Sequence, residues 1–191
     1  AVHRKHHQFS DKEGDPHSPV LLGFWRVFLL NFWYYQQEAK KPETLRRFAP
    51  DIQEREDWLD RWVFSLTTAG PFGLGMGSLA VLFGWRGIGI GVLHLFLYVF
   101  VAAPLINAVG HWRVGYRNYG NTAYNSRFLA WLTVGESLHN NHHAHPRSPR
   151  FSMREREEDL SWPVICALAA LHLITITGQT VMVRERPLVA R

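Results

Sequence analysis

Two long uncharged segments constrain most strongly what this chain of 191 residues can fold into. Residues 62–85 and 87–110 contain no Asp, Glu, Lys or Arg, and only Arg86 separates them. A helix needs about 20 mostly apolar residues to cross a bilayer. We therefore expect an all-α integral membrane protein with two transmembrane helices, 61–85 and 87–110, joined in a tight hairpin. The alternative is a hairpin buried in a soluble core.

The basic residues indicate how this hairpin is oriented. Ten Lys and Arg residues lie in 1–61, ten lie in 107–191, and Arg86 lies in the turn between the spans. The positive-inside rule then puts both ends of the chain in the cytoplasm. The net charge of +5 also suits an anionic ligand, but no segment resembles a nucleic-acid-binding module. The single Cys166 excludes a disulfide framework and a cysteine-based metal site within the chain.

Three further segments are expected at or near the membrane surface. Residues 20–37 are apolar and aromatic, but Arg26 near their centre disfavours crossing by about 2.5–3.5 kcal/mol, so an interfacial helix is expected. Residues 160–183 are uncharged but contain many polar groups, which favours a second interfacial helix, with a third span as the alternative. The polar residues 38–61 are expected to form a cytosolic linker with helical segments.

A histidine pattern of the form HxxHH occurs twice, at residues 3–7 and 139–143. Residues three and four apart share one face of a helix, so each segment can point three imidazoles at one place. Neutral imidazole is the commonest side-chain ligand of metals. One such motif alone could be an exposed surface or an incidental metal scavenger. Two copies on the predicted cytoplasmic side indicate a shared metal site.

Several motifs together resemble one family. They read HRKHHQFS at 3–10, DPH at 15–17, NAVGH at 107–111, GYRNY at 115–119 and GESLHNNHH at 135–143. In this order, with a membrane hairpin between them, they resemble the membrane fatty acid desaturases of the stearoyl-CoA desaturase type, and the last motif is closer to bacterial members. The family has a further HxxxxH box and a first hairpin upstream. We therefore expect residues 1–191 to be the C-terminal portion of a desaturase domain, which alone would be inactive.

The resemblance implies a fold and a set of ligands. The hairpin would carry interfacial helices and a cytoplasmic cap of histidine boxes at 111–159. Two irons would be held by His3, His6, His7, His111, His139, His142 and His143, with Asn107 reaching one iron through water. A ligating histidine usually donates its other ring nitrogen to a carboxylate or carbonyl. Glu136, three residues before His139, and Asp15 are candidates for this role, and solvation or helix capping is the alternative.

The implied reaction is the insertion of a cis double bond, with Δ9 as the implied position, into a saturated acyl-CoA using O₂ and two electrons. Redox-active iron suits this chemistry, whereas zinc has no redox chemistry. The implied partners are an acyl-CoA or acyl-lipid and a separate ferredoxin or cytochrome b5 type electron donor with its reductase. The implied location is the bacterial inner membrane. Two alternatives stay open: a related di-iron lipid hydroxylase, and a histidine-rich metal-binding membrane protein such as a transporter or sensor.

Overall fold

The computed structural model describes residues 1–53, 57–64 and 69–178, and every named element within them is a helix. In order, these elements are α1 (Val2–Phe9), α2 (Pro19–Leu22), α3 (Phe24–Ala39), α4 (Pro42–Phe48), α5 (Pro50–Gln53), α6 (Trp58–Trp62), α7 (Ala69–Leu97), η2 (Tyr98–Ala102), α8 (Ala103–Asn107), η3 (Val109–His111), α9 (Arg127–Leu132), α10 (His139–Ala144) and α11 (Ser161–Ala170). β pairing in these ranges is limited to two isolated bridges around Asn125. The all-α class is therefore confirmed for the described residues.

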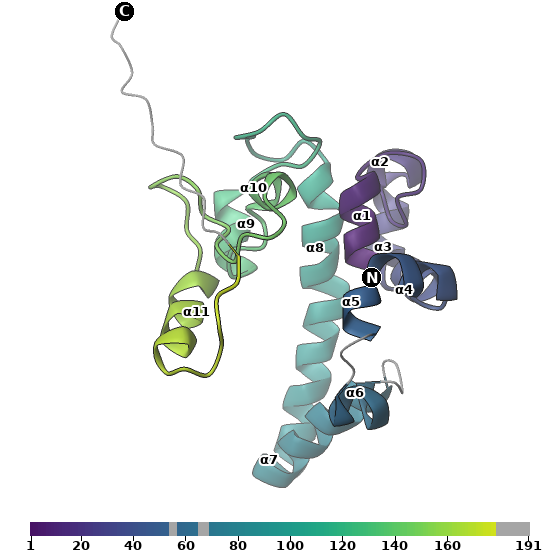
Figure 1. Cartoon of the computed structure of the whole chain (residues 1–191), viewed down its shortest axis with the longest axis vertical. Coiled ribbons are helices and arrows are strands. Elements are labelled where there is room, and N and C mark those ends of the chain that lie inside the picture. The colour runs from purple at the N-terminus through teal and green to yellow at the C-terminus, as the bar shows by residue number, and fades with distance from the viewer. Residues whose placement is uncertain (54–56, 65–68, 179–191) are drawn as a thin grey trace, which may run out of the picture.

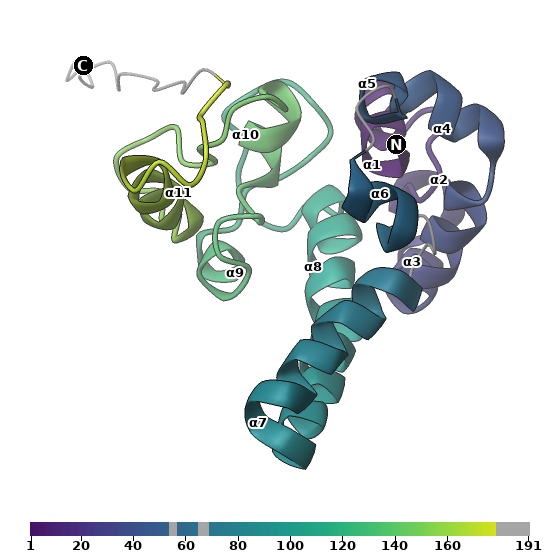
Figure 2. The same cartoon turned by 60° about the horizontal axis from the view of Figure 1, so that its bottom comes forward.

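The long apolar helix α7 folds back on itself at Gly84. This glycine has φ 59° and ψ −143°, a conformation that breaks the helix and that residues with a Cβ rarely adopt. Beyond it, Gly87 lies against Leu79 and Gly91 lies against Met76, so the two halves run side by side in opposite directions. The ribbon turns at the lower tip in Figures 1 and 2. The second half continues through η2 and α8 to the end of η3.

The segment Gly70–His111 is the one part of the described chain that is long and apolar enough to cross a membrane. Only 11% of its most apolar window is buried, so most of its apolar side chains face outwards, as a lipid-exposed helix requires. Its start differs from the prediction of 61–85. A short helix, α6, ends at Trp62, and α7 begins at Ala69.

The segments expected at the membrane surface are helical in part. Residues 20–37 fall in α2 and α3, which Gly23 separates, and α3 exposes Trp25, Leu29 and Trp33. Within 160–183 only α11 is helical, and the chain runs on to residue 178 without a helix; residues 179–183 lie outside the described residues. Residues 38–61 contain α4, α5 and the start of α6.

The first helix is held by the end of α3 and by α4. Lys5 donates a 2.7 Å hydrogen bond to buried Glu38, which also accepts from Thr44. Arg4 pairs with Asp51. These contacts hold α1 to α5 together as one unit. In Figure 1 this unit lies on one side of the upper end of the rod formed by α7 to η3, while α9 to α11 lie on the other side. The end of the rod therefore lies between α1 and α10, the two helices that carry the histidine motifs.

Candidate metal centre

Seven histidines from three elements meet at the end of the rod. The four-histidine group consists of His6, His111, His139 and His143, and the three-histidine group consists of His3, His7 and His142. In the first group the Nε2 atoms follow one another at 3.2, 3.1 and 3.1 Å. In the second the three Nε2 atoms are mutually 2.9–3.0 Å apart. Two nitrogens bound at right angles to one metal, each about 2.1 Å from it, lie about 3.0 Å apart, so both groups have the spacing of metal ligands.

Two carboxylates orient the four-histidine group. The Nδ1 atom of His6 donates to both oxygens of Asp15 at 2.9 and 3.0 Å, and that of His111 donates to Asp11 at 2.7 Å. Each Nδ1 therefore carries hydrogen, and in the neutral ring Nε2 then presents its lone pair. These two lone pairs face each other at 3.2 Å between buried rings, an arrangement that is unfavourable unless a cation lies near both.

The three-histidine group leads to the same conclusion by another argument. The ring nitrogens of His3, His7 and His142 form a closed triangle. A neutral ring nitrogen is either a donor or an acceptor, so at least one of the three contacts must join two donors or two acceptors. A bound cation removes the conflict, because all three nitrogens can then offer it their lone pairs. The residues present therefore fit a metal ion in each group.

Five of the seven histidines are held in the neutral form that binds metals. Burial, reinforced by neighbouring histidines, lowers the pKa of His3 to about 4 and that of His142 to about 3. The same causes lower the pKa of His7 to about 2 and bring those of His139 and His143 well below the ordinary range. Burial alone would raise the pKa of Asp11, but its hydrogen bond from His111 lowers it to about 2. The rings of His3, His7, His139, His142 and His143 are thus neutral at neutral pH, and Asp11 is ionised.

Two asparagines inside the second motif hold α10 in place. Asn140 accepts hydrogen bonds from the backbone of Asn118 and Tyr119, and Asn141 donates to Glu157 and to the backbone of Phe151. Both asparagine side chains are fully buried. They join the histidine helix to the loops at 115–126 and 151–159, so the positions of the histidines depend on them.

Gly110 allows the ring of His139 to reach the neighbouring histidines. A Cβ at this position would lie 2.8 Å from Cδ2 of His139, which is too close for any side chain. His111 follows directly, and its Nε2 lies 3.1 Å from that of His139. The absence of a side chain at residue 110 is therefore what brings these two rings together.

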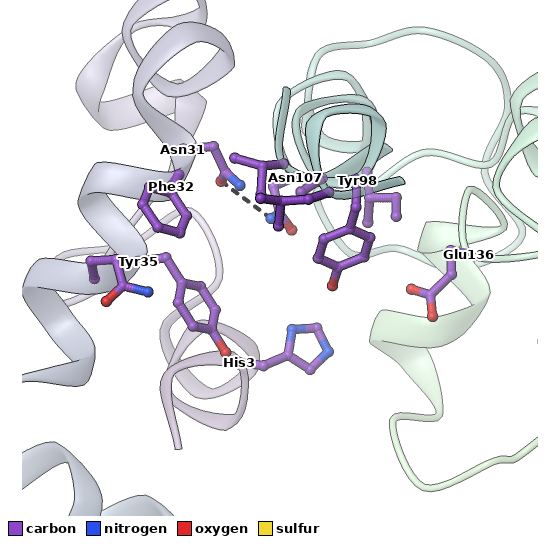
Figure 3. A pocket seen from close by; sticks show the side chains of 12 residues that line it. His3, Asn31, Phe32, Tyr35, Tyr98, Asn107 and Glu136 are labelled. Atoms are coloured by element: carbon purple, nitrogen blue, oxygen red, sulfur yellow. Dashed lines mark hydrogen bonds between the residues drawn. The ribbon is translucent and has the colours of Figure 1, made fainter. Parts of the chain in front are cut away.

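A cavity of about 450 Å³ opens beside the histidines, between α3 and the second half of the rod (Figure 3). Its walls are formed by Asn31, Phe32, Tyr35, Gln36, Leu95, Tyr98, Val99, Ala103, Ile106 and Asn107, with His3 and Glu136. Asn107 donates a 3.2 Å hydrogen bond from Nδ2 to Oδ1 of Asn31, so the amide oxygen of Asn107 is left for another partner. Apolar atoms thus form most of the cavity surface, and polar side chains such as His3, Asn107 and Glu136 are distributed around its walls (Figure 3).

The chain matches the family model described as fatty acid desaturase over residues 1–175. This match covers most of the 191 residues. The chain belongs to the fatty acid desaturase family. The family expected from the motifs is thereby confirmed, and both histidine groups lie inside the matched region.

Named relatives agree with this membership of the desaturase family. The Delta-9 desaturase-like 1 protein of Arabidopsis thaliana is 35% identical over 92% of this chain and 57% of its own length. The sn-1 stearoyl-lipid 9-desaturase of Anabaena variabilis is 34% identical, over 91% of this chain and 62% of its own. An acyl-CoA 5-desaturase of Anemone leveillei is 35% identical, over 92% and 53%. The desaturase-family chain thus spans somewhat more than half the length of these relatives.

Of the two carboxylates that the sequence of this desaturase-family chain offers as partners of histidines, Asp15 accepts a hydrogen bond from His6, whereas Glu136 accepts none from His139. Glu136 lines the cavity, its carboxylate on the opposite wall from Tyr35 (Figure 3), and no hydrogen bond joins it to His139, whose Nδ1 has no partner among the described residues. Burial and the nearby Asp159 raise the pKa of Glu136. The sequence did not predict Asp11 as the hydrogen-bond partner of a histidine. The only available signal was its spacing of four residues from Asp15, directly after the first motif.

A third group of possible ligands, His6, Asp15 and His17, has a different character. Asp15 already accepts hydrogen bonds from His6 and from the backbone of Asp11 and His17, which leaves it little capacity for a metal. The ring of His17 stacks on that of His6 at 4.5 Å, and neither of its nitrogens has a hydrogen-bond partner among the described residues. His17 therefore packs against a ligand candidate without joining either group.

Proposed function

We propose that this chain provides a di-iron centre and part of the acyl pocket of a membrane desaturase. The enzyme would introduce a cis double bond, at Δ9, into a saturated acyl chain, using O₂ and two electrons. The family match and relatives named as 9-desaturases support this proposal. The acyl carrier would be CoA or a glycerolipid, since relatives named for acyl-CoA and for stearoyl-lipid both match. A separate ferredoxin or cytochrome b5 type protein with its reductase would supply the electrons.

The observation that carries the proposal is the pair of lone pairs that His6 and His111 direct at each other. The four-histidine group would hold one iron, with Asn107 near it through water. The three-histidine group would hold the other. When bound, iron supplies the reaction with O₂ that yields an oxidant able to take hydrogen from an unactivated methylene.

The residues of the chain itself would position the substrate and manage protons. Phe32, Tyr35 and Ile106 would hold the acyl chain by its apolar surface and exclude water from the reacting methylene. The hydrogen bond from Asn107 to Asn31 would direct the Asn107 amide oxygen towards the centre. Glu136 is the only carboxyl group among the lining residues, and its raised pKa suits it to hold or transfer a proton there.

We also propose that the two halves of α7, with the elements that follow, cross the bacterial inner membrane as a hairpin with both chain ends in the cytoplasm. The exposed apolar side chains of the hairpin support this topology. α9 and α11 would lie at the interface, because α9 exposes Phe128 and Trp131 and α11 exposes Val164. Both histidine groups would then lie on the cytoplasmic side, where soluble electron donors are available.

The test is product analysis in cells that express the full-length protein containing residues 1–191, with residues 1–191 alone beside it. We expect gas chromatography with mass spectrometry to find a new cis alkene with the full-length protein. The 191 residues alone should insert but give none, because their seven histidines are, by the family resemblance, about two ligands short. A hydroxylated acyl chain would indicate the related hydroxylase, and one zinc per chain without product would indicate a metal-binding protein.

A further inference from the structure

A second cavity, of about 340 Å³, lies between the two halves of α7. The first half contributes Pro71, Phe72, Gly75, Met76 and Leu79, and the second contributes Gly91, His94, Leu95 and Tyr98. Residues 75 and 79 are four apart, as are residues 91 and 95, so each set lies along one face of its helix. The cavity therefore follows the inner faces of the hairpin from the level of Tyr98 towards the bend at Gly84.

The two cavities share part of their walls. Leu95 and Tyr98 line the cavity beside the histidines and also line the cavity inside the hairpin. Tyr98 is also the first residue of η2, a π-helical turn, and such turns inside α-helices are frequent at functional sites. His3 and Asn107 line the first cavity only, whereas Gly75 and Met76 line the second only. A long chain held with one methylene near the histidines would thus continue past Tyr98 into the hairpin.

We infer that the cavity inside the hairpin receives the methyl end of the acyl substrate, and that Gly75 and Met76 set the longest chain that fits. This inference rests on the proposed desaturase function and names a specificity determinant for it. The lining suits an alkyl chain, since Leu79 and Leu95 are apolar and Met76 is flexible enough to adapt to a ligand. A Cβ at Gly75 would meet no atom within 4 Å, so the space beside it is open.

The lack of a side chain at residue 75 makes the test direct. Leucine at this position would project into open space rather than into another side chain, and it would occupy volume that the cavity otherwise offers. Gly77 is the matched control: it lies in the same helix, its Cβ would also meet no atom within 4 Å, and it does not line the cavity. The opposite change is Met76→Ala, which removes volume from the wall and should lengthen the space.

The experiment feeds saturated fatty acids of graded length to cells that express the full-length protein or one variant, and measures unsaturated products by gas chromatography. A misfit of one methylene in an apolar pocket changes discrimination by about 10–200-fold. We therefore expect Gly75→Leu to reduce the ratio of long to short products by about tenfold or more while short substrates are still desaturated. Met76→Ala should raise this ratio, and Gly77→Leu should leave it unchanged.

The outcomes separate this inference from the function on which it rests. An unchanged length profile in both Gly75→Leu and Met76→Ala, with normal amounts of alkene, would overturn the inference and leave the desaturase function intact. Equal shifts in Gly75→Leu and Gly77→Leu would also overturn it, because they would show that the hairpin responds to packing or to a membrane lipid in the cleft. Absence of alkene from the unmodified protein would overturn both. If Gly75→Leu fails to accumulate in membranes, the sign of the Met76→Ala shift decides.

Discussion

The four-histidine group and the three-histidine group both draw on the two HxxHH motifs, the first with His111 in addition, but they are supported differently. Three of the four rings in the first group are buried, and carboxylates orient His6 and His111. In the second group no ring is fully buried, and within the described residues no carboxylate hydrogen-bonds to any of the three. A hydrogen-bond partner on the ring nitrogen that does not face the metal fixes the tautomer and direction of a histidine ligand and increases its affinity for a metal. The first group is therefore prepared for its metal, whereas the second depends more on the metal to order it.

Loss of a ligand from the less supported group should have the largest effect. His142 belongs to the three-histidine group, and its Nε2 lies 2.9 Å from that of His7. We expect His142→Ala to reduce desaturation by about 100-fold or more, since ligand number sets the metal site. His145→Ala is the control, because His145 packs against Tyr119 and belongs to neither group. Alkene yield in membranes with matched protein levels measures both, and a comparable loss from the two changes would contradict the assignment.

Weakening the support of the more rigid group should have a smaller effect that is specific to one metal. Asp15→Asn leaves the shape of the side chain but removes the charge that His6 Nδ1 faces. Changes to such partners cost about 10–100-fold in metal affinity, and we expect this loss for one iron only. Asp51→Asn is the control, since Asp51 also binds a residue of α1, the exposed Arg4, but lies away from both groups. Iron titration followed by elemental analysis would show the loss of affinity for one iron in Asp15→Asn. An equal loss of both irons would refute the division into two groups.

Acid should destabilise the metal-free protein. The folded state lowers the pKa of His3 to about 4 and that of His142 to about 3, from 6.5. Below about pH 6.5 the unfolded chain binds protons that the folded rings do not bind, so stability falls as the pH drops towards these values. The fall is up to about 1.4 kcal/mol per pH unit for His142 and less for His3, which is exposed and screened by solvent. Urea unfolding in detergent at pH 7 and pH 5 measures the slope. His142→Ala should make this slope shallower, and a stability that does not change over this interval would count against neutral rings in the folded protein.

A change one contact away from the candidate ligands should have the smallest effect. Asn31→Leu removes the acceptor of the Asn107 amide hydrogen while keeping an apolar cavity wall. We expect kcat to fall by less than about tenfold with KM nearly unchanged, because Asn31 orients a group without touching the metal. Asn31→Asp keeps an acceptor and should restore part of the rate. A fall in protein level with no change in kcat would instead assign Asn31 a purely structural role.

The sequence predicted the parts of the site that depend on local spacing. HxxHH on a helix gives three rings on one face, and α1 and α10 both use this spacing. The same rule failed for Glu136, because α10 begins at His139 and Gly135, with φ 105°, lies in the turn before it. A three-residue offset across a turn does not place two side chains on one face. Glu136 consequently lines the cavity instead of contacting His139.

Contacts between distant segments could not be predicted in this way. The pairing of Asp11 with His111 joins residues 100 positions apart, and Asn141 reaches Glu157 across a loop. Local spacing carries no information about such partners. The helix expected over residues 160–183 also ends earlier, at Ala170. His172, soon after this end, adopts a φ of 57°, and the β-branched residues that follow have low helix propensity. Uncharged composition alone did not distinguish this end from a longer helix.

The most direct test of the account is an iron-binding titration of the full-length protein in detergent, with residues 1–191 alone measured in parallel. The account predicts two irons for each full-length chain, one bound at least about tenfold more tightly than the other. It also predicts that residues 1–191 alone keep the tight site, because the four-histidine group and its carboxylates, Asp11 and Asp15, lie wholly within them. One zinc per chain, or two irons of equal affinity that are lost together in Asp15→Asn, would contradict it.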